Sequence, residues 1–180
     1  MRQKVEQLDH FISDVLSHSK NLKTDVLVEE VNFQKIIDQT FDDLNYLKGV
    51  EQVQKNITIS VKDFKSDPWR VSEIFRNLVS NAIKYRRLDH AQTLISVNIT
   101  ADGNHCFIIF RDNGIGIEKT SLDRIFEMFY RASDQSEGSG LGLYIVRNAV
   151  EKLGGNVKVD SELGRGTTFK IILPNQRLAK

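Results

Sequence analysis

The sequence predicts an α/β (α+β) two-layer sandwich, in which helices pack on one face of a mixed, mostly antiparallel sheet. Apolar residues recur with helical spacing in residues 33–47 and 68–87, which indicates two amphipathic helices. Apolar and polar residues alternate at 57–61, as in a strand, and Asp102-Gly103-Asn104 joins two further strand-like runs as a hairpin. This mixture of helices and hairpin-linked strands is typical of a sheet with helices on one face.

The predicted elements have recognisable local boundaries. Asn32 caps the first amphipathic helix and Gly49 follows it, whereas Asp67 caps the second and Pro68 occupies its first turn. The remaining expected elements are strands at 26–31, 94–100 and 106–111, a glycine-rich polar stretch at 113–140 with a short helix at 121–128, a helix at 141–153, and strands at 156–161 and 167–173.

The first 23 residues predict a separate amphipathic helix. Its apolar residues follow one another at steps of three and four, which suits a helix made to pack on another helix. The alternative is an amphipathic helix that packs on its own domain. The residues in question are Val5, Leu8, Ile12 and Val15, with Phe11 and Leu16 beside them and Leu22 further on.

Composition excludes several classes of protein. The 180 residues are 40% apolar and 27% charged, with a net charge of +1, as expected for one globular domain and a short appendage. This balance gives no reason to expect nucleic acid as a partner. Cys106 lies in an apolar run, which favours a buried, reduced thiol. No apolar run approaches the roughly 20 residues that span a bilayer, so we expect a cytoplasmic location, with any membrane anchor in other regions of the parent protein.

Asp112-Asn113-Gly114-Ile115-Gly116 follows an apolar strand. A carboxylate at this point can accept a hydrogen bond from an exocyclic amine, and the glycines let the backbone approach a flat ligand. The same residues also suit an ordinary turn. Gly138-Ser139-Gly140-Leu141-Gly142-Leu143 precedes a helix, so its N–H groups could meet phosphates, although a flexible linker would look similar.

Polar residues interrupt the apolar pattern of the second amphipathic helix. Asn77 and Asn81 lie one turn apart, and Lys84 and Tyr85 follow. Asparagine is unfavourable inside helices, which favours a ligand-binding role over a solvated stripe. An amide oxygen suits Mg²⁺, and a lysine suits phosphate. Further along, Arg131 ends an aromatic run, and Gly164-Arg165-Gly166-Thr167-Thr168 forms a tight turn into a strand.

Together and in this order, these motifs resemble the catalytic ATP-binding domain of sensor histidine kinases, which has the Bergerat (GHKL-type) fold. The resemblance covers residues 24–174. Residues 77–85 correspond to the asparagine box, 126–131 to the phenylalanine box, and the three glycine boxes to 112–117, 138–143 and 164–168.

The resemblance implies a role for each motif. Asp112 should bind the adenine amino group, Asn81 should coordinate Mg²⁺ with Asn77 near the phosphates, and residues 113–140 should form the ATP lid. Asn77, Lys84 and Arg131 are the residues expected to act in phosphoryl transfer. The other expected nucleotide contacts are Tyr85, Gly114, Gly116, Ile117, Phe129, Gly138, Ser139, Gly140, Leu141, Gly142, Leu143 and Thr167.

The first helix is similar to the second helix of the dimerisation hairpin of these kinases. We therefore expect residues 1–23 to be part of that hairpin, 24–175 to be the catalytic domain, and 176–180 to be a tail. The family's acceptor histidine has a setting that none of His10, His18, His90 and His105 reproduces, so we expect it on a preceding helix outside this sequence. The resemblance also implies a homodimer and a response regulator as partners.

Three alternatives remain open at this point. Related ATPases carry a water-activating glutamate four residues before the metal-binding asparagine, where this sequence has Asn77. Anti-sigma-type serine kinases share the fold but are not expected to carry the hairpin-like helix. A non-catalytic nucleotide-binding module is the third alternative, and it would not need the intact asparagine, lysine, aspartate and glycine positions.

Overall fold

The computed structural model of the chain describes residues 12, 14–17, 19–89, 92–132 and 139–176. Its main sheet has five strands in the order β2-β4-β5-β7-β6. Strand β2 is parallel to β4, and the other neighbouring pairs are antiparallel. The strands are β2 (Val53–Ser60), β4 (Thr93–Ala101), β5 (His105–Asp112), β6 (Asn156–Glu162) and β7 (Gly166–Pro174).

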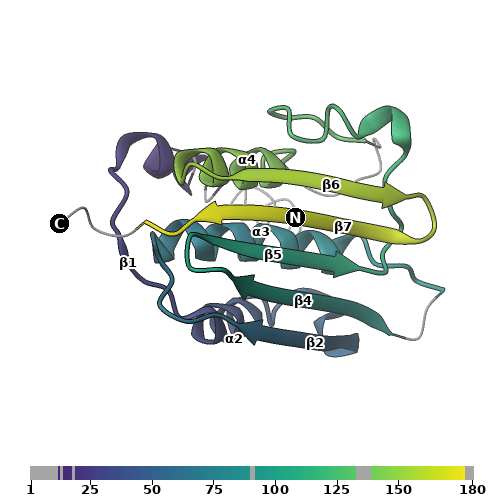
Figure 1. Cartoon of the computed structure of the whole chain (residues 1–180). Helices are drawn as coiled ribbons and strands as arrows, with labels where there is room; N and C mark the ends of the chain where they lie inside the picture. The colour runs from purple at the N-terminus through teal and green to yellow at the C-terminus, as the bar shows by residue number, and fades with distance from the viewer. Residues whose placement is uncertain (1–11, 13, 18, 90–91, 133–138, 177–180) are drawn as a thin grey trace.

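Three helices cover one face of this sheet: α2 (Phe33–Asp43), α3 (Pro68–Lys84) and α4 (Gly142–Lys152) (Figure 1). Asn32 accepts the Lys35 N–H and Asp67 accepts the Arg70 N–H, so both predicted helix caps are present. The two-layer sandwich with a mixed, mostly antiparallel sheet is therefore confirmed.

The core lies between the sheet and the helices. Along β5, Cys106, Ile108 and Phe110 are buried while the residues between them are more exposed, as the two-residue period of a strand requires. Asp112 continues this alternation and thus faces the helix layer. Helix α3 fills the centre of that layer, and its Ile74, Phe75 and Leu78 side chains are each at most 1% exposed.

The N-terminal helix touches the sandwich through its polar side. The described residues between 12 and 23 are helical. Ser17 and Asn21 are buried, whereas the apolar side chains of Ile12, Val15, Leu16 and Leu22 are exposed. The apolar stripe of this helix thus stays uncovered by its own domain. Val5, Leu8 and Phe11 lie outside the described residues.

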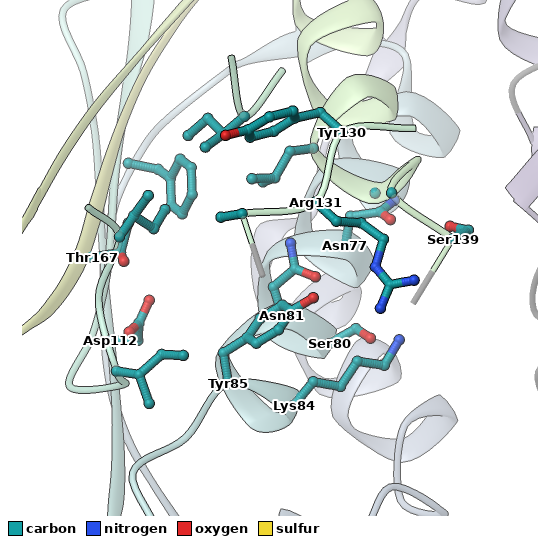
Figure 2. A pocket seen from close by; sticks show the side chains of 18 of the residues that line it. Asn77, Ser80, Asn81, Lys84, Tyr85, Asp112, Tyr130, Arg131, Ser139 and Thr167 are labelled. Carbon is teal, nitrogen blue, oxygen red and sulfur yellow. The ribbon is translucent and has the colours of Figure 1, made fainter. Parts of the chain in front are cut away.

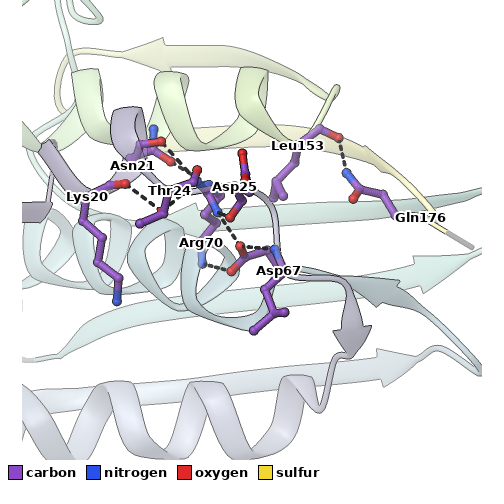
Figure 3. A network of polar contacts seen from close by, with 9 residues as sticks. Lys20, Asn21, Thr24, Asp25, Asp67, Arg70, Leu153 and Gln176 are labelled. Atoms are coloured by element: carbon purple, nitrogen blue, oxygen red, sulfur yellow. Dashed lines mark hydrogen bonds and ion pairs between the residues drawn. The ribbon is translucent and has the colours of Figure 1, made fainter. Parts of the chain in front are cut away.

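Arg70 of α3 holds the end of this helix (Figure 3). Its guanidinium donates to the carbonyl oxygens of Asn21 (3.1 Å), Thr24 (2.7 Å) and Asp25 (3.2 Å) and pairs with the Asp67 carboxylate. The last carbonyls of a helix lack partners within the helix, and a guanidinium satisfies several at once. Because Arg70 is 1% exposed, this contact fixes the chain between the helix and the sandwich.

Some predicted elements were wrong in extent. The strand expected at 26–31 is only β1 (Glu29–Glu30), which pairs with an unpredicted strand, β3 (Lys65–Ser66). The expected helix at 121–128 is instead a 3₁₀ turn, η2 (Lys119–Ser121), followed by turns. In this segment several backbone N–H groups donate to the carbonyl oxygen three residues earlier, as Arg124 does to Ser121 (2.9 Å), and such bonds make a tighter turn than an α-helix. The two amphipathic helices end earlier than expected, at Asp43 and Lys84, and a second 3₁₀ turn, η1 (Val50–Gln52), precedes β2.

Candidate functional site

A single pocket brings together most of the residues singled out by the motifs. It has a volume of about 290 Å³. It lies between α3, the start of α4, the end of β5, the start of β7, and the loop after β5. Figure 2 shows Asp112 and Thr167 at the sheet side and Lys84, Arg131 and Ser139 at the opposite side. The expected ligand residues that line it are Asn77, Asn81, Lys84, Tyr85, Asp112, Gly116, Ile117, Arg131, Ser139, Gly140, Gly142, Leu143 and Thr167.

Helix α3 supplies the floor of the pocket. Asn77, Asn81 and Lys84 lie at steps of four and three, which places them on one side of the helix. The Asn77 amide nitrogen donates to the Glu73 carbonyl oxygen at 2.8 Å. A Cβ at Gly142 would lie 3.0 Å from the Asn77 Oδ1 and 3.7 Å from the Asn81 Oδ1, so both amide oxygens approach the first turn of α4.

Asp112 lies at the sheet side and is 8% exposed. Burial raises the pKa of its carboxyl, although the backbone N–H groups of Gly114 and Thr167 act in the opposite direction. The Gly114 N–H donates to the Asp112 Oδ1 at 2.8 Å. These bonds orient the carboxylate and leave it capacity to accept from a ligand.

The loop before α4 forms the opposite side. The Leu141 N–H donates to the Ser139 Oγ at 3.1 Å, and the Phe129 N–H donates to the Gly140 carbonyl oxygen at 3.1 Å. Gly140 has a φ of +72°, and a Cβ there would lie 2.8 Å from the Phe129 carbonyl carbon, so glycine is required. The aromatic run that ends at Arg131 is therefore in direct contact with the loop before α4.

Four residues that were expected to bind the nucleotide are not among the described residues that line the pocket. Gly114 packs under the end of α3, where a Cβ would lie 2.7 Å from the Tyr85 carbonyl oxygen. Leu141 is 0% exposed and belongs to the core, and Phe129 is 53% exposed with a φ of +64°. Gly138 lies outside the described residues.

Other pocket residues were missed by the sequence analysis. Arg76 and Ser80 precede the two asparagines and share their four-residue spacing, so the helical period could have pointed to them. Tyr130 adjoins Arg131 in the aromatic run. Asp14 and Tyr46 come from distant segments and gave no local signal.

The donor set fits magnesium bound together with phosphate groups. Within the described part of the chain, no three His, Cys, Asp or Glu side chains converge as a metal cage. Mg²⁺ takes oxygen ligands and is usually held by few protein groups together with substrate phosphates and water, and the Asn77 and Asn81 amide oxygens could serve as such ligands. None of the helices formed by the described residues has the length and apolar composition needed to cross a bilayer.

The chain belongs to the histidine kinase-, DNA gyrase B-, and HSP90-like ATPase family, which matches residues 66–177. It is 34% identical over 178 residues to the methanogenesis regulatory histidine kinase FilI of Methanothrix harundinacea (strain 6Ac), which covers 97% of this chain and 20% of that protein. It is also 34% identical over 188 residues to the autoinducer 2 sensor kinase/phosphatase LuxQ of Vibrio parahaemolyticus, and this match covers 97% of this chain and 22% of that protein.

A solved structure of full-length ShkA in complex with AMPPNP has the same fold, with a TM-score of 0.78 and 24% identity, covering 99% of this chain and 38% of that one. Within the family, these likenesses place the chain among the ATP-binding catalytic domains of sensor histidine kinases. The resemblance inferred from the motifs is thus confirmed. The chain spans about a fifth of the length of FilI and LuxQ.

Proposed function

We propose that this chain binds ATP with Mg²⁺ and transfers the γ-phosphoryl group to a histidine on a dimerisation helix, for relay to a response regulator. The observation that supports this most is the polarity of the pocket. A buried carboxylate, Asp112, lies at one side, and two cations, Lys84 and Arg131, lie at the other. An adenine nucleotide has the matching arrangement, with an amine on its base and anionic phosphates at its far end.

The sheet side suits adenine. Asp112 would accept a hydrogen bond from the exocyclic amine, while Ile117, Leu143 and Phe169 provide apolar surface for the ring. Guanine presents a carbonyl oxygen at the equivalent position, which would face the carboxylate without a hydrogen. The pocket should therefore prefer adenine.

The opposite side suits phosphates. Lys84 and Arg131 would neutralise the phosphate chain, and the start of α4 adds backbone N–H groups with favourable dipoles. The Asn81 oxygen would hold magnesium, with Asn77 beside it. Bound magnesium supplies further charge neutralisation for phosphoryl transfer, in which positioning and electrostatics are the main contributions of a protein.

The residues on the floor of the pocket favour phosphoryl transfer to a side chain over hydrolysis of ATP. Asn77 occupies the position of the water-activating glutamate of related ATPases, and an amide is not a general base. Glu73, one turn earlier, accepts a hydrogen bond from Ser17 and pairs with Arg76 at 3.4 Å. It is not among the residues that line the pocket.

The N-terminal helix supports a homodimeric parent protein. Its exposed stripe, Ile12, Val15, Leu16 and Leu22, could pack in a helical bundle. Because one short helix is marginal by itself, we expect this chain alone to be a monomer or a weak dimer. Sedimentation with and without residues 5–22 measures this, and a tight dimer that survives the deletion would contradict it.

The catalytic proposal is tested by phosphotransfer in trans. The chain is incubated with radiolabelled ATP, Mg²⁺ and a separately produced dimerisation hairpin that carries the acceptor histidine. We expect slow labelling of the hairpin, lost in acid as a phosphoramidate is, and abolished by Lys84→Ala. Acid-stable label on serine or threonine would indicate a serine kinase, and rapid phosphate release without label would indicate an ATPase.

A further inference from the structure

The N-terminal helix contributes a carboxylate to the pocket. Asp14, Ser17 and Asn21 lie at steps of three and four on its polar side. Ser17 donates to Glu73, and Asn21 accepts from the Arg70 Nε at 2.8 Å, so this side lies along α3. Asp14, the first of these three residues, lines the pocket and accepts a hydrogen bond from the Ser139 Oγ at 2.6 Å.

The position of Ser139 shows which side of the pocket Asp14 reaches. In Figure 2, Ser139 lies on the same side as Lys84 and Arg131 and away from Asp112. Arg76 and Tyr46 also line the pocket, and the charges of Arg76 and Asp14 both influence the pKa of the Tyr46 phenol. Burial raises the pKa of the Tyr46 phenol, Arg76 lowers it, and Asp14 raises it. Asp14 therefore shares the cationic side of the pocket with the groups that would meet phosphate.

The other carboxylates of the described pocket wall are differently placed. Asp112 lies at the sheet side, and Glu118 belongs to the loop after β5. Asp14 alone among these three accepts a bond from the loop that precedes α4. Its charge opposes an incoming phosphate, and its bond occupies the Ser139 hydroxyl hydrogen that a phosphate oxygen could otherwise accept.

We propose that Asp14 determines the nucleotide preference of this pocket. While the N-terminal helix is docked on α3, the Asp14 carboxylate disfavours a nucleoside triphosphate relative to the diphosphate, because the triphosphate brings more negative charge to the same side. A triphosphate binds fully only when Asp14 releases Ser139. This inference rests on the proposed nucleotide site and concerns a specificity residue of that site.

Calorimetric titration of the full chain with Mg-ATP, Mg-ADP and adenosine tests the proposal. Asp14→Asn keeps an oxygen that can accept from Ser139 but removes the charge, so ATP binding should tighten about tenfold, ADP binding less, and adenosine binding not at all. Asp14→Ala also frees the Ser139 hydroxyl and should tighten ATP binding at least as much. Asp25→Asn is the matched control, because it removes the same charge from an exposed residue outside the pocket wall.

The gain for Asp14→Asn should shrink as ionic strength rises, because salt screens partly exposed charges. Equal tightening of all three ligands, or the same effect from Asp25→Asn, would overturn the proposal. So would unchanged ATP affinity in both Asp14 variants. If instead adenosine and ADP fail to bind the unaltered chain, the proposed function itself has failed, and the two failures are thus distinguishable.

Discussion

Replacing Asp112 by Asn should weaken adenine nucleotide binding without unfolding the domain. The structure supports both parts of this expectation. An asparagine oxygen can still accept the Gly114 N–H that lies 2.8 Å from the carboxylate, so the local turn should survive. The hydrogen bond from the adenine amine to a charged acceptor is lost, however. Such a bond is worth about 1.5–3 kcal/mol, which corresponds to about 10- to 150-fold in Kd.

The same substitution should relax base selectivity. With its oxygen on the Gly114 N–H, the asparagine presents its amide nitrogen to the ligand, where it can donate to the carbonyl oxygen of guanine, which a carboxylate cannot do. Calorimetry with Mg-ADP and Mg-GDP measures both effects, and a denaturant titration checks that the free energy of unfolding is retained. An Asp112→Asn variant that still prefers adenine with full affinity would refute the assignment of Asp112 to the base.

The pH dependence of binding provides a second measure of Asp112. Burial raises the pKa of this carboxyl, so it takes up a proton at a higher pH than an ordinary aspartate. ADP affinity should therefore fall as the pH is lowered through that raised value, and the fall should be absent in Asp112→Asn. For folding, the sign is opposite: a folded-state pKa above the unfolded one means that the contribution of Asp112 to stability decreases as pH rises between the two values.

Three further predictions concern metal, packing and backbone. Asn81→Ala should remove the Mg²⁺ dependence of ATP binding and keep the fold; calorimetry with and without Mg²⁺ decides this, and an unchanged dependence would exclude Asn81 as the ligand. Arg70→Ala should cost about 3–5 kcal/mol of unfolding free energy because it leaves buried Asp67 unpaired, whereas Arg147→Ala, at an exposed ion pair, should cost under about 1 kcal/mol. Gly116→Ala should cost about 2–4 kcal/mol, since its φ is +72° and a Cβ would lie 2.1 Å from the Glu162 carbonyl oxygen. Gly164→Ala, with a φ of +81° and no atom within 4 Å, should cost only about 1–2 kcal/mol. Denaturant titrations measure the four losses of unfolding free energy. Equal losses for Arg70→Ala and Arg147→Ala would contradict the importance of the buried ion pair, and equal losses for Gly116→Ala and Gly164→Ala would contradict the steric explanation.

Local patterns were sufficient for much of the fold and part of the site. The two-residue period of β5 places Asp112 on the helix-facing side, and the helical period of α3 places Asn77 and Asn81 together. These signals are strong because one face of each element is buried. The glycine-rich stretch was less informative. Its apolar residues suggested a helix near 121–128, but the chain makes tight turns there, which local composition does not distinguish from a helical turn.

Contacts between distant segments could not be predicted from local patterns. Asp14 reaches the pocket from a helix whose end is bound by Arg70 and whose Ser17 donates to Glu73, more than 50 residues away in sequence. Leu141, which was expected to contact nucleotide, is the N-cap residue of α4, and its side chain is 0% exposed. In both cases tertiary packing decides where a side chain points.

A crystal structure of the full chain with Mg²⁺ and AMPPNP would test the central claim most directly. We expect the exocyclic amine of adenine to lie within hydrogen-bond distance of the Asp112 carboxylate. We also expect magnesium on the Asn81 oxygen and phosphates beside Lys84 and Arg131. An analogue bound with its base away from Asp112, or with its phosphates at the sheet side, would contradict the account.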